Sequence, residues 1–322
     1  MKNTISIILI FTCVFYSAQQ TPLNSLYFQN LYMINSAEVG KTNQLKFNLS
    51  HRQQWVGFEG APTTTWFTVQ KKLNRNLNFG IRFNYDQISF FEKLQFDASS
   101  SYLLKIDKAN ELTFGLSLGM IQGSLVMNNM ISTDNSDEIL LNNGVNGVGF
   151  HSDFGIAYSL NKKLNIGISF PNLFTTSMNI EPMNIDQTYD YKMHRIAYLS
   201  YELDMSSDVK FTPIILIRKA AGLSNQIDLI GNFNFQNNYW GGLGFRQQGG
   251  FLVNVGFSPI DNLNLTYSYE FNNSKIASFT SGSHELMLSF ALKNKTKENP
   301  QTEENQEQNT TDDQEKESEI NK

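Results

Sequence analysis

The side chains best suited to acid–base or metal chemistry are four histidines, His51, His151, His194 and His284. The last of them lies in the run Ser283-His284-Glu285, which contains a nucleophile, a base and a carboxylate. Adjacent residues of a strand point to opposite faces, so Ser283 and His284 are not expected to form a nucleophile–base pair. The histidines lack the local spacing of a metal site, and no Gly-x-Ser-x-Gly motif is present. We therefore expect a protein that is not an enzyme, with no catalytic residue, no metal and no cofactor.

His151 and Asp153 are the one pair that an extended strand would bring together. They stand two positions apart in "FHSDFG" and so share a face. Two interpretations remain open: a polar pair that lines an interior, or ordinary solvated side chains, and we favour the second. Cys13 is the only cysteine and precedes the expected mature chain, which excludes disulfides and cysteine-based metal sites.

The elements that must position these residues are strands, because apolar residues recur at every second position. In "NLNFGIRFNYD", Leu77, Phe79, Ile81, Phe83 and Tyr85 alternate with polar residues and glycine. This period places all apolar side chains on one face of a strand. About 14 segments show it, at residues 45–52, 63–71, 77–87, 93–105, 111–121, 147–160, 164–170, 193–203, 210–217, 225–235, 239–247, 250–257, 262–271 and 283–292.

The connections between the segments favour a membrane protein. Short polar turns such as "KLNRN" and "DKAN" alternate with links that are mostly longer, the longest at 122–146 and 171–192. We therefore predict an all-β fold, a transmembrane antiparallel β-barrel of about 14 strands with short periplasmic turns and longer outer loops. The alternative is a soluble sandwich or lipocalin-like barrel. Against it stand the number of strands and the polar residues at inward positions, namely Arg82, Asp86, Arg246 and Glu270. Aromatic residues near strand ends, such as Tyr239 and Trp240, also indicate an interfacial girdle.

The two ends of the chain differ from the middle. Residues 1–18 resemble a signal peptide that directs export to the outer membrane, with a positive start, an apolar run and small residues at its end. Residues 19–44 are too rich in aromatic residues for a solvated leader, so we expect a plug in the lumen or a periplasmic binding segment. The barrel is expected at 45–292. Residues 293–322 are expected to form a disordered acidic tail.

The net charge gives no indication of nucleic-acid binding. The whole chain carries −5, and residues 298–322 contain nine acidic and two basic residues. That tail contributes −7, so the remaining chain carries +2. The acidity belongs to the tail alone, and we expect no nucleic-acid partner.

A cluster of aromatic residues around a glycine-rich turn is the candidate binding site. The run "HRQQWVGFEGAPTTTWF" falls at the outer end of the first predicted hairpin. In one interpretation it forms a docking surface for a partner, since aromatic residues dominate interface energetics. In the other, Trp55 and Trp66 anchor the barrel at the membrane interface while glycine and proline shape the loop. The candidate residues are Arg52, Gln53, Gln54, Trp55, Gly57, Phe58, Gly60, Pro62 and Trp66.

Within this cluster, "RQQWVGFEGAPTT" closely resembles the signature of the PorP/SprF family of the Bacteroidetes type IX secretion system. Other stretches agree in order, and departures are Thr21, where an acidic residue is usual, and Ser36, where proline is usual. The supporting stretches are "QQTPLNSLYFQNLYMINSAEVG", "DFGIAYSLNKKLNIGISFPNL", "HRIAYLSYEL", "YWGGLGFR", "YSYEF" and "SGSHELMLSF".

The resemblance implies a non-enzymatic outer-membrane component of the secretion and gliding-motility machinery. Its implied role is to support secretion and surface attachment of adhesin-type cargo by protein–protein docking. The implied partners are periplasmic lipoproteins of the machinery, a secreted surface adhesin and outer-membrane lipid. The alternative function is a transporter or porin for small or hydrophobic solutes, because barrels of this size also serve uptake.

Overall fold

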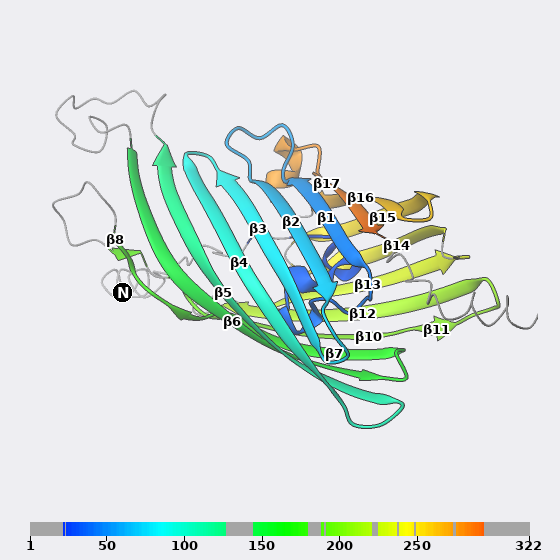
Figure 1. The fold of residues 1–322 in the computed structure, drawn as a ribbon. Coiled ribbons are helices and arrows are strands. Elements are labelled where there is room, and N and C mark those ends of the chain that lie inside the picture. The colour runs from blue at the N-terminus through cyan, green and yellow to red at the C-terminus, as the bar shows by residue number, and fades with distance from the viewer. Residues whose placement is uncertain are drawn as a thin grey trace, which may run out of the picture. The chain divides into compact units, whose positions relative to one another are not determined.

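The structure is a computed structural model, shown in Figure 1. It describes residues 22, 24–126, 144–179, 188–189, 191–220, 225–236, 238–247, 249–272 and 275–292. The expected signal peptide and acidic tail lie outside the described residues. No helix among the described residues is long and apolar enough to cross a membrane.

Fourteen long antiparallel strands of the described chain form a closed barrel. The first strand, β1, pairs with the last, β17, and the pairing of β10 with β12 completes the ring. The two-residue strand β11 (Leu203–Asp204) extends the line of β10 along β12, and β8 (Met178–Asn179) pairs with β9 (Thr188–Tyr189) outside the ring. The long strands are β1 (Leu45–Gln53), β2 (Thr63–Lys72), β3 (Leu77–Ile88), β4 (Phe91–Lys105), β5 (Asn110–Val126), β6 (Gly144–Leu160), β7 (Leu164–Thr175), β10 (His194–Tyr201), β12 (Val209–Ala220), β13 (Gln226–Phe235), β14 (Tyr239–Arg246), β15 (Gly250–Ile260), β16 (Leu263–Asn272) and β17 (Ser283–Leu292).

The predicted barrel is confirmed, and each predicted segment overlaps one of these strands. The connections at the outer end are mostly longer than the turns at the opposite end, as predicted. Strands β5 and β6 pair all the way to Val126 and Gly144, so residues 122–126 and 144–146 at the two ends of the predicted link are sheet. Two other connections at this end, 89–90 and 247–249, are as short as the turns at the opposite end.

Apolar side chains cover the outward face of the barrel. Leu118 and Phe150 are 61% and 59% exposed, although both lie in the middle of long strands. The same exposure recurs around the barrel, with Leu77, Phe79, Phe96, Leu116, Leu229, Leu243 and Phe251 all exposed. Such a continuous apolar surface matches the lipid-facing band of an outer-membrane barrel.

The lumenal face is polar and is covered by the N-terminal segment. Residues 24–40 form three short 3-10 turns, η1 (Tyr27–Gln29), η2 (Leu31–Met33) and η3 (Ser36–Glu38), which are the dark-blue elements within the ring of strands in Figure 1. Leu26, Tyr27 and Met33 are buried against inward side chains of the barrel wall, among them Trp66, Ile196, Tyr198, Leu216, Ile230, Leu252 and Met287. We call residues 24–40 the plug.

Glycine makes room for the plug on two neighbouring strands. Gly115 of β5 and Gly155 of β6 are paired across the sheet. A Cβ atom at Gly115 would collide with the backbone of Ser36 and Ala37, and one at Gly155 would collide with the Asn35 side chain. The plug can therefore lie directly against the strand backbones.

Candidate functional site: a lumen closed by the N-terminal segment

A buried ion network near the outer ends of the strands holds the beginning of the plug. We call it the Arg246 network, and it comprises Arg52, Asp228, Arg246, Glu270 and Glu285 from five different strands. Arg246 is 0% exposed and donates to both oxygens of Asp228 at 3.1 Å and to Glu270 at 2.7 Å. Such charges are stable away from water only when they are paired and hydrogen-bonded.

The plug takes part in this network through Ser25 and Asn24. The backbone N–H of Ser25 donates to Glu285 at 2.6 Å, and its hydroxyl donates to Glu270 at 2.9 Å. Arg52 donates to the Ser25 hydroxyl at 2.7 Å, and Arg246 donates to the carbonyl of Asn24 at 2.9 Å. Removing the plug would leave these charged groups short of partners, so plug and wall stabilise one another.

A second buried network, the Arg82 network, holds the middle of the plug. It comprises Arg82, Asp97, His151 and Asp153. Arg82 donates to Asp97 at 2.9 Å and also to Asp153, while its Nη1 donates to the carbonyls of Tyr32 at 3.3 Å and Met33 at 3.2 Å. The guanidinium also lies over the rings of Tyr32 and Trp66, with its Cζ 5.7 and 5.9 Å from their centroids.

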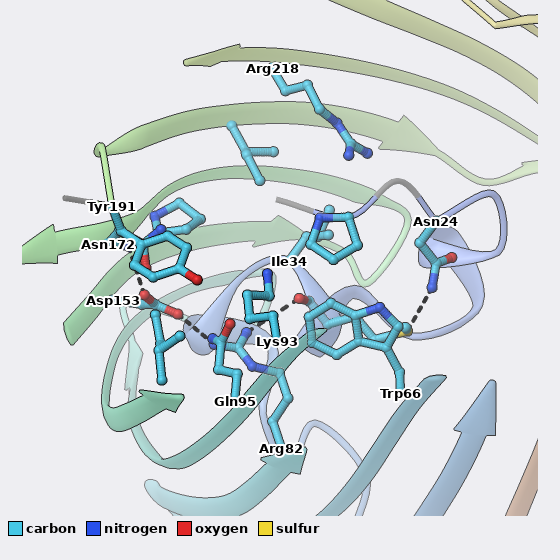
Figure 2. A pocket seen from close by; sticks show the side chains of 15 residues that line it. Asn24, Ile34, Trp66, Arg82, Lys93, Gln95, Asp153, Asn172, Tyr191 and Arg218 are labelled. Carbon is cyan, nitrogen blue, oxygen red and sulfur yellow. Dashed lines mark hydrogen bonds and ion pairs between the residues drawn. The ribbon is translucent and has the colours of Figure 1, made fainter. Parts of the chain in front are cut away.

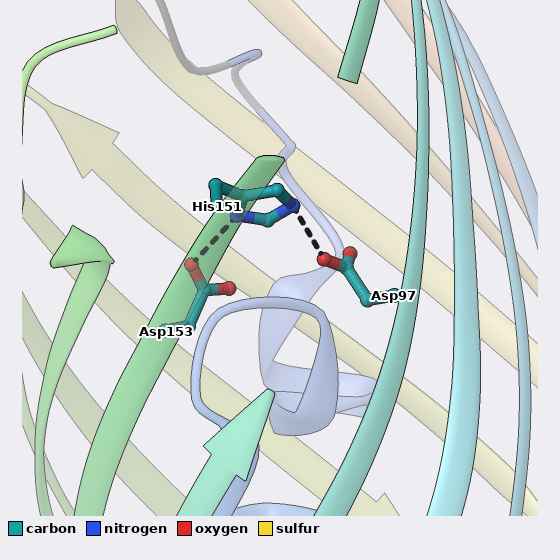
Figure 3. Close-up of side chains that lie close together, drawn as sticks. All are labelled: Asp97, His151 and Asp153. Atoms are coloured by element: carbon teal, nitrogen blue, oxygen red, sulfur yellow. Dashed lines mark hydrogen bonds and ion pairs between the residues drawn. The ribbon is translucent and has the colours of Figure 1, made fainter. Parts of the chain in front are cut away.

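The donor groups of the Arg82 network would suit a metal by type but not by arrangement. Asp97, His151 and Asp153 offer ligand atoms within 4.8 Å of one another. Figure 3 shows that each ring nitrogen of His151 already faces a carboxylate, at 2.8 Å for Asp97 and 3.3 Å for Asp153. Arg82 neutralises both carboxylates, so a cation would have to displace it. The cluster is a closed ion network, and our preference for a separate, solvated His151 and Asp153 was wrong.

The last part of the plug is held near the short-turn end of the barrel. Glu38 accepts hydrogen bonds from Tyr198 and from Asn165, the latter at 3.2 Å, and pairs with Lys41 at 2.5 Å. The Gly40 N–H donates to Gln70 at 2.9 Å. Hydrogen bonds therefore hold the plug along its whole length.

Two tyrosines of the plug illustrate how dry its surroundings are. Burial raises the pKa of Tyr27 far above its usual value and raises the pKa of Tyr32 to about 12. Tyr32 donates to the hydroxyl of Ser99 at 2.9 Å. Both phenols stay neutral at physiological pH, so the plug brings no unpaired phenolate charge into the lumen.

The structure divides the nine candidate binding residues into two groups. Arg52 and Trp66 are buried in the lumen, so Trp66 is neither an interface anchor nor part of an outer surface. Gln54, Trp55, Gly57, Phe58, Gly60 and Pro62 lie in the β1–β2 loop, with Gln53 at its base. Trp240, which we expected in an aromatic girdle, also points inward and donates to Thr266 at 3.2 Å.

The β1–β2 loop has a defined conformation at the outer mouth. Gly57 and Gly60 have positive φ angles of 95° and 70°, which glycine adopts without strain. Trp55 also has a positive φ angle, 51°. The Val56 N–H donates to the Gly282 carbonyl at 2.8 Å, and the Ser89 N–H donates to the Gly60 carbonyl at 3.0 Å. The loop is therefore tied to both neighbouring connections.

Three aromatic side chains remain exposed on these connected loops. Phe58 is 45% exposed, and Phe90 and Phe279, from the β3–β4 and β16–β17 connections, are exposed as well. We call Phe58, Phe90 and Phe279 the outer aromatic residues. Only Phe58 was predicted from the sequence. Phe90 and Phe279 are distant from it in the sequence, and their loops are joined to the β1–β2 loop only in the folded protein.

A polar interior with a plug and an apolar exterior define an outer-membrane β-barrel protein. The sequence matches the family described as "Type IX secretion system membrane protein PorP/SprF" over residues 16–290. The chain belongs to the PorP/SprF family and is an outer-membrane component of type IX secretion.

Solved structures with a similar fold include a monoaromatic hydrocarbon channel, CymD, with 9% identity and a TM-score of 0.51 over 86% of this chain and 95% of that chain. The P. putida toluene transporter TodX is 10% identical, with a TM-score of 0.49 over 82% of this chain and 94% of that chain. At this identity the likeness to CymD shows the fold alone. A search of curated proteins found no match.

Proposed function

We propose that this barrel serves type IX secretion as a docking platform with a closed lumen, and that it supports the export and surface attachment of adhesin-type cargo. The main support is the plug, which two ion networks fix to the barrel wall. A lumen that is filled in this way favours docking of partner proteins on the barrel over passage of solutes through it. The same role would make the protein a contributor to gliding motility.

The outer aromatic residues are the proposed cargo contact. Exposed aromatic side chains on a loop of fixed conformation offer large apolar area at low entropic cost. Phe58 lies between two positive-φ glycines, and the loop is hydrogen-bonded to its neighbours. The proposed docking surface comprises Trp55, Phe58, Phe90 and Phe279, whereas Arg52 and Trp66 are buried in the lumen and lie outside it.

Periplasmic lipoproteins are the proposed partners at the opposite end. There, Lys41, Lys72, Lys105 and Lys162 line an open recess together with the single carboxylate of Glu111. A surplus of lysine favours a partner surface that carries acidic residues.

The experiment is adhesin secretion by cells that carry Phe58→Ala with Phe279→Ala. We expect surface adhesin to fall several-fold while the amount of heat-modifiable barrel in the outer membrane stays the same. Leu243→Ala, an exposed apolar residue on the barrel wall, is the control. Normal secretion by the double variant would remove the support for docking at this loop.

The alternative function, transport of solutes, is less well supported because little free space remains in the lumen. The recess between plug and outer barrel wall has about 40 Å³ of space for water-sized molecules. That is room for about three waters and is too small for an aromatic hydrocarbon.

A further inference from the structure

Arg218 is a buried cation that the two ion networks leave without a full set of partners. It lines the recess between the plug and the outer part of the barrel wall. Figure 2 shows the Arg218 side chain directed into this recess, opposite Trp66 and Lys93. Its other walls include Ile34, Asn172 and Ile196. The recess therefore combines apolar side chains with three cations, Arg82, Lys93 and Arg218.

Arg218 is 9% exposed, and its Nε and Nη2 atoms have no hydrogen-bond partner among the described residues. The nearest carboxylate oxygen with which it forms an ion pair belongs to Asp228, 3.8 Å from Nη2, which is beyond hydrogen-bond distance. Both oxygens of Asp228 already accept hydrogen bonds from Arg246 at 3.1 Å. A buried guanidinium with unused donors is costly and calls for a further acceptor.

The surroundings hold the Arg218 side chain in place. Its Cζ atom lies 5.8 Å from the centroid of the Tyr27 ring, a cation–π distance. Asp153, the carboxylate on the recess wall, accepts hydrogen bonds from Arg82 and from the Asn172 N–H, the latter at 2.8 Å. The unused Arg218 donors are thus fixed in position, and this carboxylate is already engaged elsewhere.

We propose that Arg218 binds a carboxylate group in this recess. A guanidinium fork pairs with a planar carboxylate through two parallel hydrogen bonds. The small volume, about 40 Å³, limits the ligand to a compact carboxylate, and Ile34, Ile196 and Trp66 offer apolar contact to its short alkyl group. The ligand class is a compact monocarboxylate, either free or at the end of a longer chain. This site stands apart from the proposed docking surface.

Ligand-observed NMR on the full chain in detergent, with propionate and its neutral isostere propionamide as probes, tests the site. We expect saturable binding of propionate and none of propionamide. Arg218→Gln should weaken propionate binding by about tenfold, because it removes a charge-assisted pair. Arg218→Lys keeps the charge and should bind propionate more tightly than Arg218→Gln does. It replaces the glutamine variant in the comparison if that variant fails to fold. The exposed Arg75→Gln is the matched control and should bind as the parent does.

A second pair of probes separates the two sources of the carboxylate. An acetylated tripeptide with a free C-terminal carboxylate should bind if the site accepts a chain end, and its C-terminal amide should not. Binding of propionate alone identifies a site for free monocarboxylates. Equal binding of propionate and propionamide, no binding of either acid, or unchanged affinity in Arg218→Gln would overturn the proposal, and water would then be the partner of Arg218.

Discussion

The outward and lumenal faces of the same strands obey opposite rules. On β3, Leu77 and Phe79 are exposed on the outside, whereas Asn78 and Arg82 are buried on the inside. Nothing in the described part of the chain covers the outer face, which needs lipid. The lumenal face finds its partner in residues 24–40 of its own chain, which supply backbone groups and side chains to buried charges.

This difference shows that one alternating pattern can encode two unlike environments. Any apolar solvent satisfies the outer face, so its residues are interchangeable within limits of size and hydrophobicity. Specific partners are required in the lumen, because a buried charge or donor without an acceptor is costly. Substitutions in the lumen should therefore have larger and more specific effects than those outside.

The largest effect is expected from Arg246→Gln. It leaves the carboxylates of Asp228 and Glu270 buried without their main cation, which costs about 3–5 kcal/mol of unfolding free energy. Urea unfolding of the barrel in lipid vesicles, followed by tryptophan fluorescence, measures this loss. Arg75→Gln, in an exposed turn, should change stability by less than about 0.5 kcal/mol. Equal effects of the two substitutions would mean that the Arg246 network contributes little.

A charge on the outer face should cost somewhat less. Phe67 lies outward in the middle of β2, beside the inward Trp66. Phe67→Arg places a cation in lipid and should destabilise the inserted barrel by about 2–4 kcal/mol. The same vesicle assay checks this value, with Phe67→Leu as the control. If the arginine variant is as stable as the parent, lipid does not contact this face.

A third substitution tests the close approach of plug and wall. Gly115→Ala puts a methyl group into the backbone of Ser36 and Ala37, so overpacking should cost about 1–3 kcal/mol. Gly241→Ala is the matched control, since its added Cβ would meet nothing closer than 3.4 Å. Protease cleavage within residues 24–40 should become faster in the first variant only. Equal protection in both variants would argue against the packed plug.

The smallest effect on stability is expected at the outer aromatic residues. Phe58→Ala removes an exposed side chain and should change the unfolding free energy by less than about 0.5 kcal/mol. Its effect should appear in secretion instead. A marked loss of stability would assign Phe58 a structural role.

The strands could be predicted from the sequence because their signal is local. Alternation in a stretch such as residues 77–87 depends only on neighbours two positions apart. The same pattern placed Arg82, Asp86, Arg246 and Glu270 inward, which the structure confirms. The prediction that Trp66 and Trp240 lie at the membrane interface was wrong. Both occupy inward positions, where a tryptophan packs against the plug or the wall.

The contacts within the lumen could not be predicted in this way. Arg82 and Asp153 are 71 residues apart, and Ser25 and Glu285 are 260 apart. The sequence around each of these residues does not indicate its partner, because the two residues of each pair meet only when the barrel closes. The inward charges were visible in the sequence, and the missing information was which of them meet and that the plug lies between them.

Single-channel conductance in planar bilayers tests the closed lumen most directly, with the full mature chain compared with a variant that lacks residues 24–40. A lumen filled by the plug predicts no steady conductance for the full chain and open channels for the deletion variant. A steady, ion-conducting pore formed by the full chain itself would contradict the closed lumen and favour a transporter.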